Sequence, residues 1–309
     1  IHDNYNYGTG AGVYNLGTYT MSSGYIRNNT SSGGGGVQNN GIFNLKGGEI
    51  KDNISGRLGG GVRNDGTFTM SGGGINGNTA ASGGGGIFSG RNNDLNISGG
   101  TIKNNKVSSG NGGGIYTDTH NAKILSLTNT TITGNTATGG NGGGIYYNAS
   151  VTLESNNISS NSAVTGGGIA FGGSENTMKS GSVANNMATS WGGGIQVMSG
   201  SSLVLNEASI YGNTAPNDGG INNDGIIRMT GGTIHSNKCK TGNTGGGIRL
   251  GNASAYFTMT GGRIYGNQGY GIVNTLGTVD IENAPSVGNK WSFIGFEKFE
   301  NAGSGLTQA

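Results

Sequence analysis

Apolar residues recur along this chain at a nearly constant interval, and each of them closes a glycine-rich stretch. These anchor residues are Val13, Val37, Val62, Ile87, Ile115, Ile145, Ile169, Ile195, Ile221, Ile248 and Ile272. Successive anchors are 24 to 30 residues apart, so one period is repeated ten times. A period of this length is typical of repeat proteins, in which one unit buries its apolar residues only by stacking on the next.

Two further apolar elements follow the anchors. The first is an apolar-x-apolar pair such as Phe68 and Met70, whose alternation is typical of a β-strand. The second is a lone apolar residue such as Ile75, which is followed three residues later by an asparagine. These asparagines are Asn4, Asn29, Asn53, Asn78, Asn105, Asn135, Asn161, Asn186, Asn213, Asn237 and Asn267. Because Ile1 and Asn4 also fit the pattern, we expect the sequence to begin within a coil and to be a piece of a longer protein.

Three short strands in a repeat of about 25 residues leave no room for a helix. The pattern therefore predicts an all-β fold, a right-handed parallel β-helix of about eleven coils with three parallel sheets. Stacking at about 4.8 Å per coil gives a rod on the order of 50 Å long. Asparagines stacked one per coil can both donate and accept, which predicts an internal asparagine ladder. We expect residues 1–289 to form the solenoid, and the aromatic-rich residues 290–309 either to cap its open end or to begin a following segment.

Composition narrows the class of protein. Only 31% of the residues are hydrophobic and 69 are Gly, a composition that by itself is typical of a disordered, low-complexity chain. The regular spacing of the few apolar residues indicates a folded repeat protein instead. A net charge of +2 with 10% charged residues argues against a nucleic-acid partner, which requires clustered Lys and Arg. No apolar run is long enough for a transmembrane segment, and a single Cys excludes a disulfide framework. Low Cys use with abundant Asn, Ser, Thr and Gly is compatible with a bacterial protein that is secreted or displayed at the cell surface.

The repeated motifs resemble those of known families. GGGI or GGGV plus Ile-x-x-Asn, often followed by Thr-Ala as after Asn78 and Asn135, is similar to the GGA-I and F-x-x-N repeats of chlamydial-type polymorphic outer-membrane protein passengers. This sequence has Ile where the passenger motif has Phe. More broadly, almost the whole chain resembles the right-handed parallel β-helix repeats of the pectate-lyase-like superfamily. The resemblance implies the β-helix fold and a role as an adhesin, a lyase or a hydrolase.

Candidate catalytic residues are few. Catalysis on a β-helix requires carboxylates gathered on one face, but Asp65 and Asp118 are two coils apart, about 9.6 Å. In the longest insertion, Asp118 and His120 are the candidate catalytic pair if the protein is an enzyme; otherwise they belong to an exposed polar loop. His2, His120 and His235 fall on separate coils, so neither a metal nor a cofactor is predicted.

Two rows of outward-facing aromatic residues are the candidate ligand-binding residues. The first row holds Phe88, Tyr116 and Tyr146 with Asp118 and His120 beside them, and the second holds Tyr211, His235 and Tyr265. Aromatic platforms suit sugar rings or protein partners. The alternative is cross-strand stacking that only stabilises the sheet.

The sequence therefore predicts a surface-exposed adhesin or stalk-like module that recognises a host or environmental glycan, or a protein surface, along one side face. The alternative is a polysaccharide lyase or glycoside hydrolase with a groove on the first sheet, near Phe88 to Tyr146. An inert spacer is a minor alternative. Ice binding is another minor alternative, suggested by an outward Thr/Ser row on the second sheet. Asn44, Asn96, Val204 and Arg228 interrupt this row, so the β-propensity of threonine explains it better.

Overall fold

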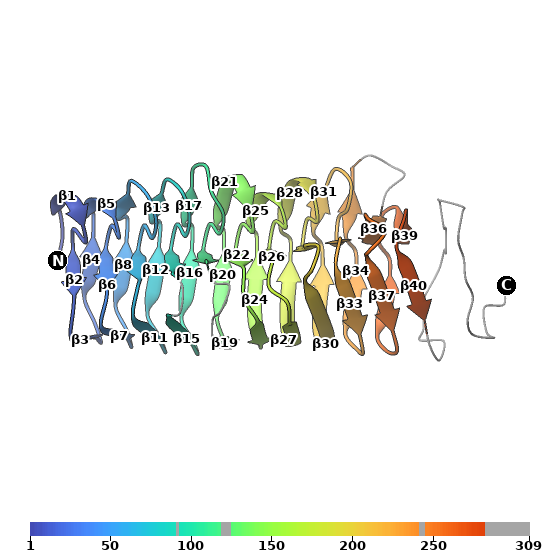
Figure 1. Cartoon of the computed structure of the whole chain (residues 1–309), viewed down its shortest axis with the longest axis horizontal. Coiled ribbons are helices and arrows are strands. Elements are labelled where there is room, and N and C mark those ends of the chain that lie inside the picture. Colours follow the sequence, from blue (N-terminus) through green and yellow to red (C-terminus); the bar gives the residue numbers. More distant parts are fainter. Residues whose placement is uncertain (91–92, 119–124, 241–244, 282–309) are drawn as a thin grey trace.

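The computed structural model describes residues 1–90, 93–118, 125–240 and 245–281, which form a rod of stacked β-coils (Figure 1). The predicted cap at 290–309 lies outside the described residues. Strands pair in parallel from coil to coil and gather in three sheets. Within the described ranges there is no helix, and so none with the length and apolar character of a membrane span.

The anchor residues lie in register in one eleven-stranded sheet, which we call the anchor sheet. Ile115 pairs with Ile87 on one side and with Ile145 on the other, and the same register continues along the rod. This confirms the prediction of about eleven coils. The strands are β2 (Val13–Asn15), β6 (Val37–Asn39), β10 (Val62–Asn64), β14 (Ile87–Ser89), β18 (Ile115–Thr117), β22 (Ile145–Tyr147), β26 (Ile169–Phe171), β29 (Ile195–Val197), β32 (Ile221–Asn223), β36 (Gly245–Leu250) and β39 (Tyr270–Asn274).

The apolar pair and the lone apolar residue of each repeat lie in one nineteen-stranded sheet, the wide sheet. Its strands are β3 (Thr18–Met21), β4 (Tyr25–Arg27), β7 (Ile42–Leu45), β8 (Glu49–Lys51), β11 (Thr67–Met70), β12 (Gly74–Asn76), β15 (Asp94–Ile97), β16 (Thr101–Lys103), β19 (Leu125–Thr128), β20 (Thr131–Thr133), β23 (Val151–Glu154), β24 (Asn156–Ser159), β27 (Asn176–Ala184), β30 (Ser202–Tyr211), β33 (Ile226–Met229), β34 (Thr233–His235), β37 (Tyr256–Met259), β38 (Arg263–Tyr265) and β40 (Thr278–Ile281).

A third sheet of ten short strands follows the ladder asparagines, and we call it the corner sheet. Its strands are β1 (Tyr5–Thr9), β5 (Thr30–Gly33), β9 (Ile54–Ser55), β13 (Thr79–Ala80), β17 (Lys106–Val107), β21 (Thr136–Asn141), β25 (Ser162–Thr165), β28 (Met187–Trp191), β31 (Thr214–Ala215) and β35 (Lys238–Cys239).

The three parallel sheets are as predicted, but the coil is divided among them differently. The second and third predicted elements share the wide sheet, since the corner between them only bends the chain; β27 and β30 run through it without a break. The corner sheet was not predicted, because its two to six residues per coil carry no apolar alternation.

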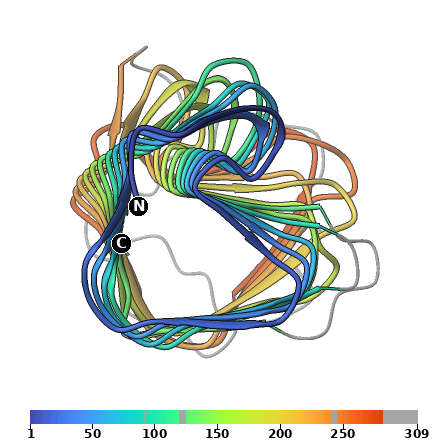
Figure 2. The same ribbon diagram turned by 90° about the vertical axis from the view of Figure 1, so that its left-hand side faces the viewer.

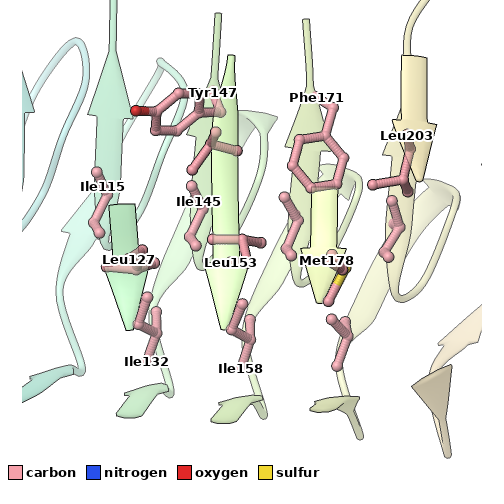
Figure 3. Close-up of a cluster of buried hydrophobic side chains, with 14 of the residues drawn as sticks. Ile115, Leu127, Ile132, Ile145, Tyr147, Leu153, Ile158, Phe171, Met178 and Leu203 are labelled. Atoms are coloured by element: carbon pink, nitrogen blue, oxygen red, sulfur yellow. The ribbon is translucent and has the colours of Figure 1, made fainter. Parts of the chain in front are cut away.

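The core is a narrow column filled by a few apolar side chains from each coil. Ile145 from the anchor sheet and Leu153 and Ile158 from the wide sheet point into the same interior and are at most 2% exposed (Figure 3). Fully burying such a side chain contributes about 1.5–3 kcal/mol. Because each coil supplies only a few of these, the column is stable only when neighbouring coils cover its two ends.

The predicted asparagine ladder is present and continuous from Asn4 to Asn267. At Asn161, which is 1% exposed, Oδ1 accepts from the backbone N (2.9 Å) and the Nδ2 (3.0 Å) of Asn135. Its own Nδ2 donates to Ile132 O and to Asn186 Oδ1, both at 3.0 Å. The residue before each ladder asparagine, here Ser160 with φ 57°, takes the left-handed conformation that turns the corner.

A second, shorter ladder was not predicted. In the inward position two residues after the anchor, Asn15 Nδ2 donates to Asn39 Oδ1 at 2.7 Å, and Asn39 Nδ2 donates to Asn64 Oδ1 at 2.8 Å. Further along the rod, Tyr147 and Phe171 fill the same position and join the core (Figure 3). The repeated Val-x-Asn of the first three anchors was the available signal.

The glycine triples are required because the chain folds deeply inward in every coil, as the view along the rod axis shows (Figure 2). At Gly144, a Cβ would lie 2.7 Å from Gly168 O and 3.0 Å from Asn161 Nδ2. Only glycine lets the backbone pass this close to both the next coil and the ladder.

Replacing Asn161 by Ala should lower the free energy of unfolding by at least about 3 kcal/mol, because it leaves buried donors and acceptors on both neighbouring coils without partners. Denaturant unfolding followed by circular dichroism measures this loss. Asn96→Ala, on an exposed position of the wide sheet, is the matched control and should change stability by no more than about 0.5 kcal/mol. Equal losses for the two variants would contradict a structural role for the ladder.

Gly144→Ala should destabilise the chain by at least about 2 kcal/mol, because the backbone of the next coil would have to move. Gly17→Ala is its control: a Cβ there meets no atom within 4 Å, so its melting temperature should match or slightly exceed that of the native chain. Thermal melts of both variants test the steric explanation, which fails if Gly144→Ala melts like Gly17→Ala.

Candidate ligand-binding face

The outer face of the anchor sheet carries two straight rows of side chains, because alternate residues of each strand face outward and the register between coils is maintained. The central row, one residue after each anchor, is Tyr14, Gln38, Arg63, Phe88, Tyr116, Tyr146, Ala170, Gln196, Asn222, Arg249 and Val273. The flanking row, two residues further on, is Asn40, Asp65, Gly90, Asp118, Asn148, Gly172, Met198, Asp224 and Gly251.

Phe88, Tyr116 and Tyr146 lie on consecutive coils, as predicted, and contact one another edge to face. Their ring centroids are 5.4 and 5.3 Å apart, with interplanar angles of 67° and 76°. Phe88 is only 5% exposed, whereas both tyrosines are half-buried. Tyr116 also packs against the backbone of Gly83 in the glycine-rich segment, where any side chain would collide with its ring. Of these three aromatic side chains, the two tyrosines are therefore the ones accessible from solvent.

The two tyrosines stay neutral over the physiological range. Burial, and next the charge of Asp118, raise the pKa of Tyr116 to about 12, and the same two causes raise the pKa of Tyr146. The Tyr146 hydroxyl donates to Met198 Sδ at 3.9 Å, and the Tyr116 hydroxyl keeps its proton as a hydrogen-bond donor. Asp118 itself lies in the flanking row with Gly90 and Asn148 on the neighbouring coils. Its predicted companion His120 lies outside the described residues.

Asp65, two coils from Asp118 in the flanking row, already has hydrogen-bond partners. Arg63 Nε and Gln38 Nε2 both donate to its Oδ2 at 2.8 Å. The carboxylate and the guanidinium thus satisfy each other within one closed network, and Asp65 does not form a catalytic pair with Asp118.

The second predicted row has a different geometry. Tyr211 and His235 stack with centroids 5.1 Å apart and an interplanar angle of 1°, and His235 stacks on Tyr265 at 4.9 Å and 12°. Parallel stacking turns the ring faces toward one another along the rod, and Arg263 lies 5.0 Å over the ring of Tyr265. Because the faces are occupied, this arrangement favours stabilisation of the wide sheet over a sugar platform.

A polar cluster further along the same face was missed by sequence reasoning. Asp218 stands where other coils have the first glycine of the triple: Gly193 N donates to Asp218 O as Gly167 N donates to Gly192 O one coil earlier. Its side chain is 0% exposed, and neither carboxylate oxygen accepts a hydrogen bond from another described residue. The available signal was DGGI in place of GGGI.

The charge nearest to Asp218 is Arg249, with Nη1 3.7 Å from Oδ2. Burial raises the pKa of Asp218 to about 7, an effect that Arg249 partly offsets and the charge of Asp224 reinforces. Asp224 Oδ2 accepts from Gln196 Nε2 at 2.9 Å and from Asn222 Nδ2 at 3.3 Å. The side-chain oxygen of the same residue, Asn222 Oδ1, is buried without a partner among the described residues. Nowhere in the described ranges do three or more His, Cys, Asp or Glu side chains gather as metal ligands.

Comparison with known proteins agrees with this architecture. A family model described as the right-handed beta helix region matches residues 124–285, more than half of the chain. The chain therefore belongs to the right-handed β-helix family. Neither the curated proteins nor the solved structures include a significant match.

Replacing Asp218 by Gly should remove a pH dependence of stability. The folded chain keeps the Asp218 proton up to a pKa of about 7, whereas the unfolded chain releases it near the ordinary pKa of an aspartate, 3.8. The free energy of unfolding of the native chain therefore falls as pH rises from about 4 to 7, by roughly 4 kcal/mol from this group, and then levels off. Denaturant unfolding of both chains from pH 4 to 8 measures the difference, and parallel curves would contradict the burial of an ionisable group.

Proposed function

We propose that this chain is an elongated binding module that recognises a carbohydrate chain along the outer face of the anchor sheet. The observation that carries the proposal is the run of Tyr116 and Tyr146, half-buried and on consecutive coils, with the carboxylate of Asp118 beside them. Aromatic rings pack against the C–H faces of sugars, and each such contact contributes about 0.5–1.5 kcal/mol beyond area burial. Asp118 and the neutral Tyr116 hydroxyl supply hydrogen bonds to sugar hydroxyls.

The straightness of the face favours an extended ligand. Successive coils place equivalent side chains about 4.8 Å apart, so the central row offers contacts at regular steps along the rod. A linear polysaccharide has a matching one-dimensional repeat and can follow such a row. The net charge of +2 and the Asn-, Ser- and Thr-rich surface support a role in an exported or surface-displayed adhesin or stalk.

An enzyme acting on polysaccharides remains the alternative. Such an enzyme requires a second acidic or basic group near Asp118, and the equivalent positions on the adjacent coils are Gly90 and Asn148. This supports binding over turnover at the aromatic row. The Thr/Ser row of the wide sheet supports ice binding poorly, because Asn44 and Arg228 occupy two of its positions in register with Thr69 and Thr258.

The double variant Tyr116→Ala/Tyr146→Ala should bind at least tenfold more weakly to whichever oligosaccharide the native chain selects from a glycan array, which corresponds to about 1.4 kcal/mol. Tyr211→Ala, in the stacked row, is the control and should bind as the native chain does. Retained binding by the double variant would contradict the proposal.

The same oligosaccharide should be recovered intact. Reducing-sugar and unsaturated-product assays with excess protein measure turnover. Product formation that Asp118→Asn abolishes would establish the enzyme instead, and selective binding to a protein ligand with no glycan bound would establish a protein-binding adhesin.

A further inference from the structure

Asp224 and Arg249 face each other across Gly251, about four coils or 19 Å from Tyr146 along the rod. A Cβ on Gly251 would lie 2.5 Å from Asp224 Oδ1 and 3.3 Å from Arg249 Nη1. The missing Cβ of Gly251 therefore leaves room for the carboxylate oxygen and the guanidinium, which both approach this backbone position. Both residues are partly exposed.

Buried side chains hold this pair from beneath. Gln196 and Asn222, 5% and 4% exposed, both donate to Asp224 Oδ2, which leaves Asp224 Oδ1 as the outward acceptor. Arg249 pairs with the fully buried Asp218 rather than with Asp224. An ionisable group without a hydrogen-bond partner is costly at a position where the repeat otherwise has glycine, so its presence here needs a reason other than folding.

The first polar network on this face shows the contrast. There, Arg63 Nε donates directly to Asp65 Oδ2 at 2.8 Å, so the charged groups satisfy each other. Around Gly251 the carboxylate and the guanidinium have different partners. The side-chain amides of Gln196 and Asn222 bind Asp224, whereas Arg249 pairs with Asp218. Each of them retains hydrogen-bonding capacity toward the outside.

The charges of Asp218, Asp224 and Arg249 favour a neutral ligand. Two carboxylates repel an anion, and the guanidinium repels a cation. A neutral group that donates to Asp224 Oδ1 and accepts from Arg249 Nη1 fits both, and the adjacent hydroxyls of a sugar ring do this.

We propose that Asp224 and Arg249 form a hydroxyl-binding subsite over Gly251 for a neutral sugar unit, with Asp218 as the positioning residue for Arg249. The subsite rests on the proposed carbohydrate-binding function and extends it to the far end of the same face.

The test is a titration of the ¹⁵N-labelled native chain with methyl β-D-glucopyranoside and with methyl β-D-glucuronide, which differs from it by a carboxylate. The neutral glycoside should shift the amide resonances of Gly251 and Asn222, and the glucuronide should bind at least fivefold more weakly. Asp224→Asn, which keeps an acceptor for Gln196, should weaken the neutral glycoside at least fivefold. Asp65→Asn, in the closed network, should leave its affinity unchanged.

A pH series tests the positioning role. Ionised Asp218 holds the guanidinium, so the affinity of the native chain should rise at least threefold from pH 6 to pH 8. Asp218→Gly restores the residue of the other coils and should bind weakly with no such rise. If Asp218 acted only in folding, its replacement would change the stability of the chain but not the pH dependence of glycoside affinity.

Unshifted Gly251 and Asn222 amides at saturating glycoside, or equal binding by Asp224→Asn, would overturn the subsite. If oligosaccharide binding through Tyr116 and Tyr146 persists in that case, only the subsite is wrong. If the glycoside shifts persist while the tyrosine variants bind oligosaccharides normally, the aromatic row is wrong and the subsite stands.

Discussion

The buried hydrogen-bond ladder of asparagine side chains is the constraint on which the rest of the rod depends. Each ladder amide has two donors and an acceptor that must be satisfied away from water, and their partners are the ladder amides of the neighbouring coils and a backbone carbonyl of the preceding coil. A coil shifted by one residue would lose these bonds and turn its apolar residues outward at the same time. The ladder therefore keeps the coils in phase, and the inward approach of the glycine triple and the left-handed corner residue follow from the space it leaves.

Because the coils are in register, the outward side chains form straight rows. The residue types in these rows can vary without changing the packing of the core. This separates stability from function in an unusual way. Residues that obey the repeat, such as Asn161 and Ile145, hold the rod together, whereas residues that break it are the ones that need another explanation. Asp218 is the clearest example, because it places a buried carboxyl group where the other coils have glycine, an exchange that we expect to lower stability near neutral pH.

Ring geometry distinguishes the two aromatic rows although their sequences look alike. The edge-to-face contacts of Phe88, Tyr116 and Tyr146 bring edges as well as faces to the surface and leave polar neighbours accessible. The parallel stack around His235 uses its ring faces internally. The same residue type at the same spacing thus stacks within one sheet and, in our proposal, binds a ligand on another, and only the side-chain orientations separate the two arrangements.

The sequence by itself determined the period, the anchors, the ladder asparagines and the outward direction of the candidate residues, because a stacked repeat converts spacing directly into position. It did not determine that the second and third elements share one sheet, since the bend between them differs from a sheet boundary only in backbone hydrogen bonds. Nor did it determine which outward residues remain accessible at the surface. Phe88 is buried whereas Tyr146 is half-buried, and Asp218 of the glycine-rich segment lies against Arg249, 31 residues away. Burial and charge pairing of this kind arise between segments of different coils, so only the tertiary structure decided them.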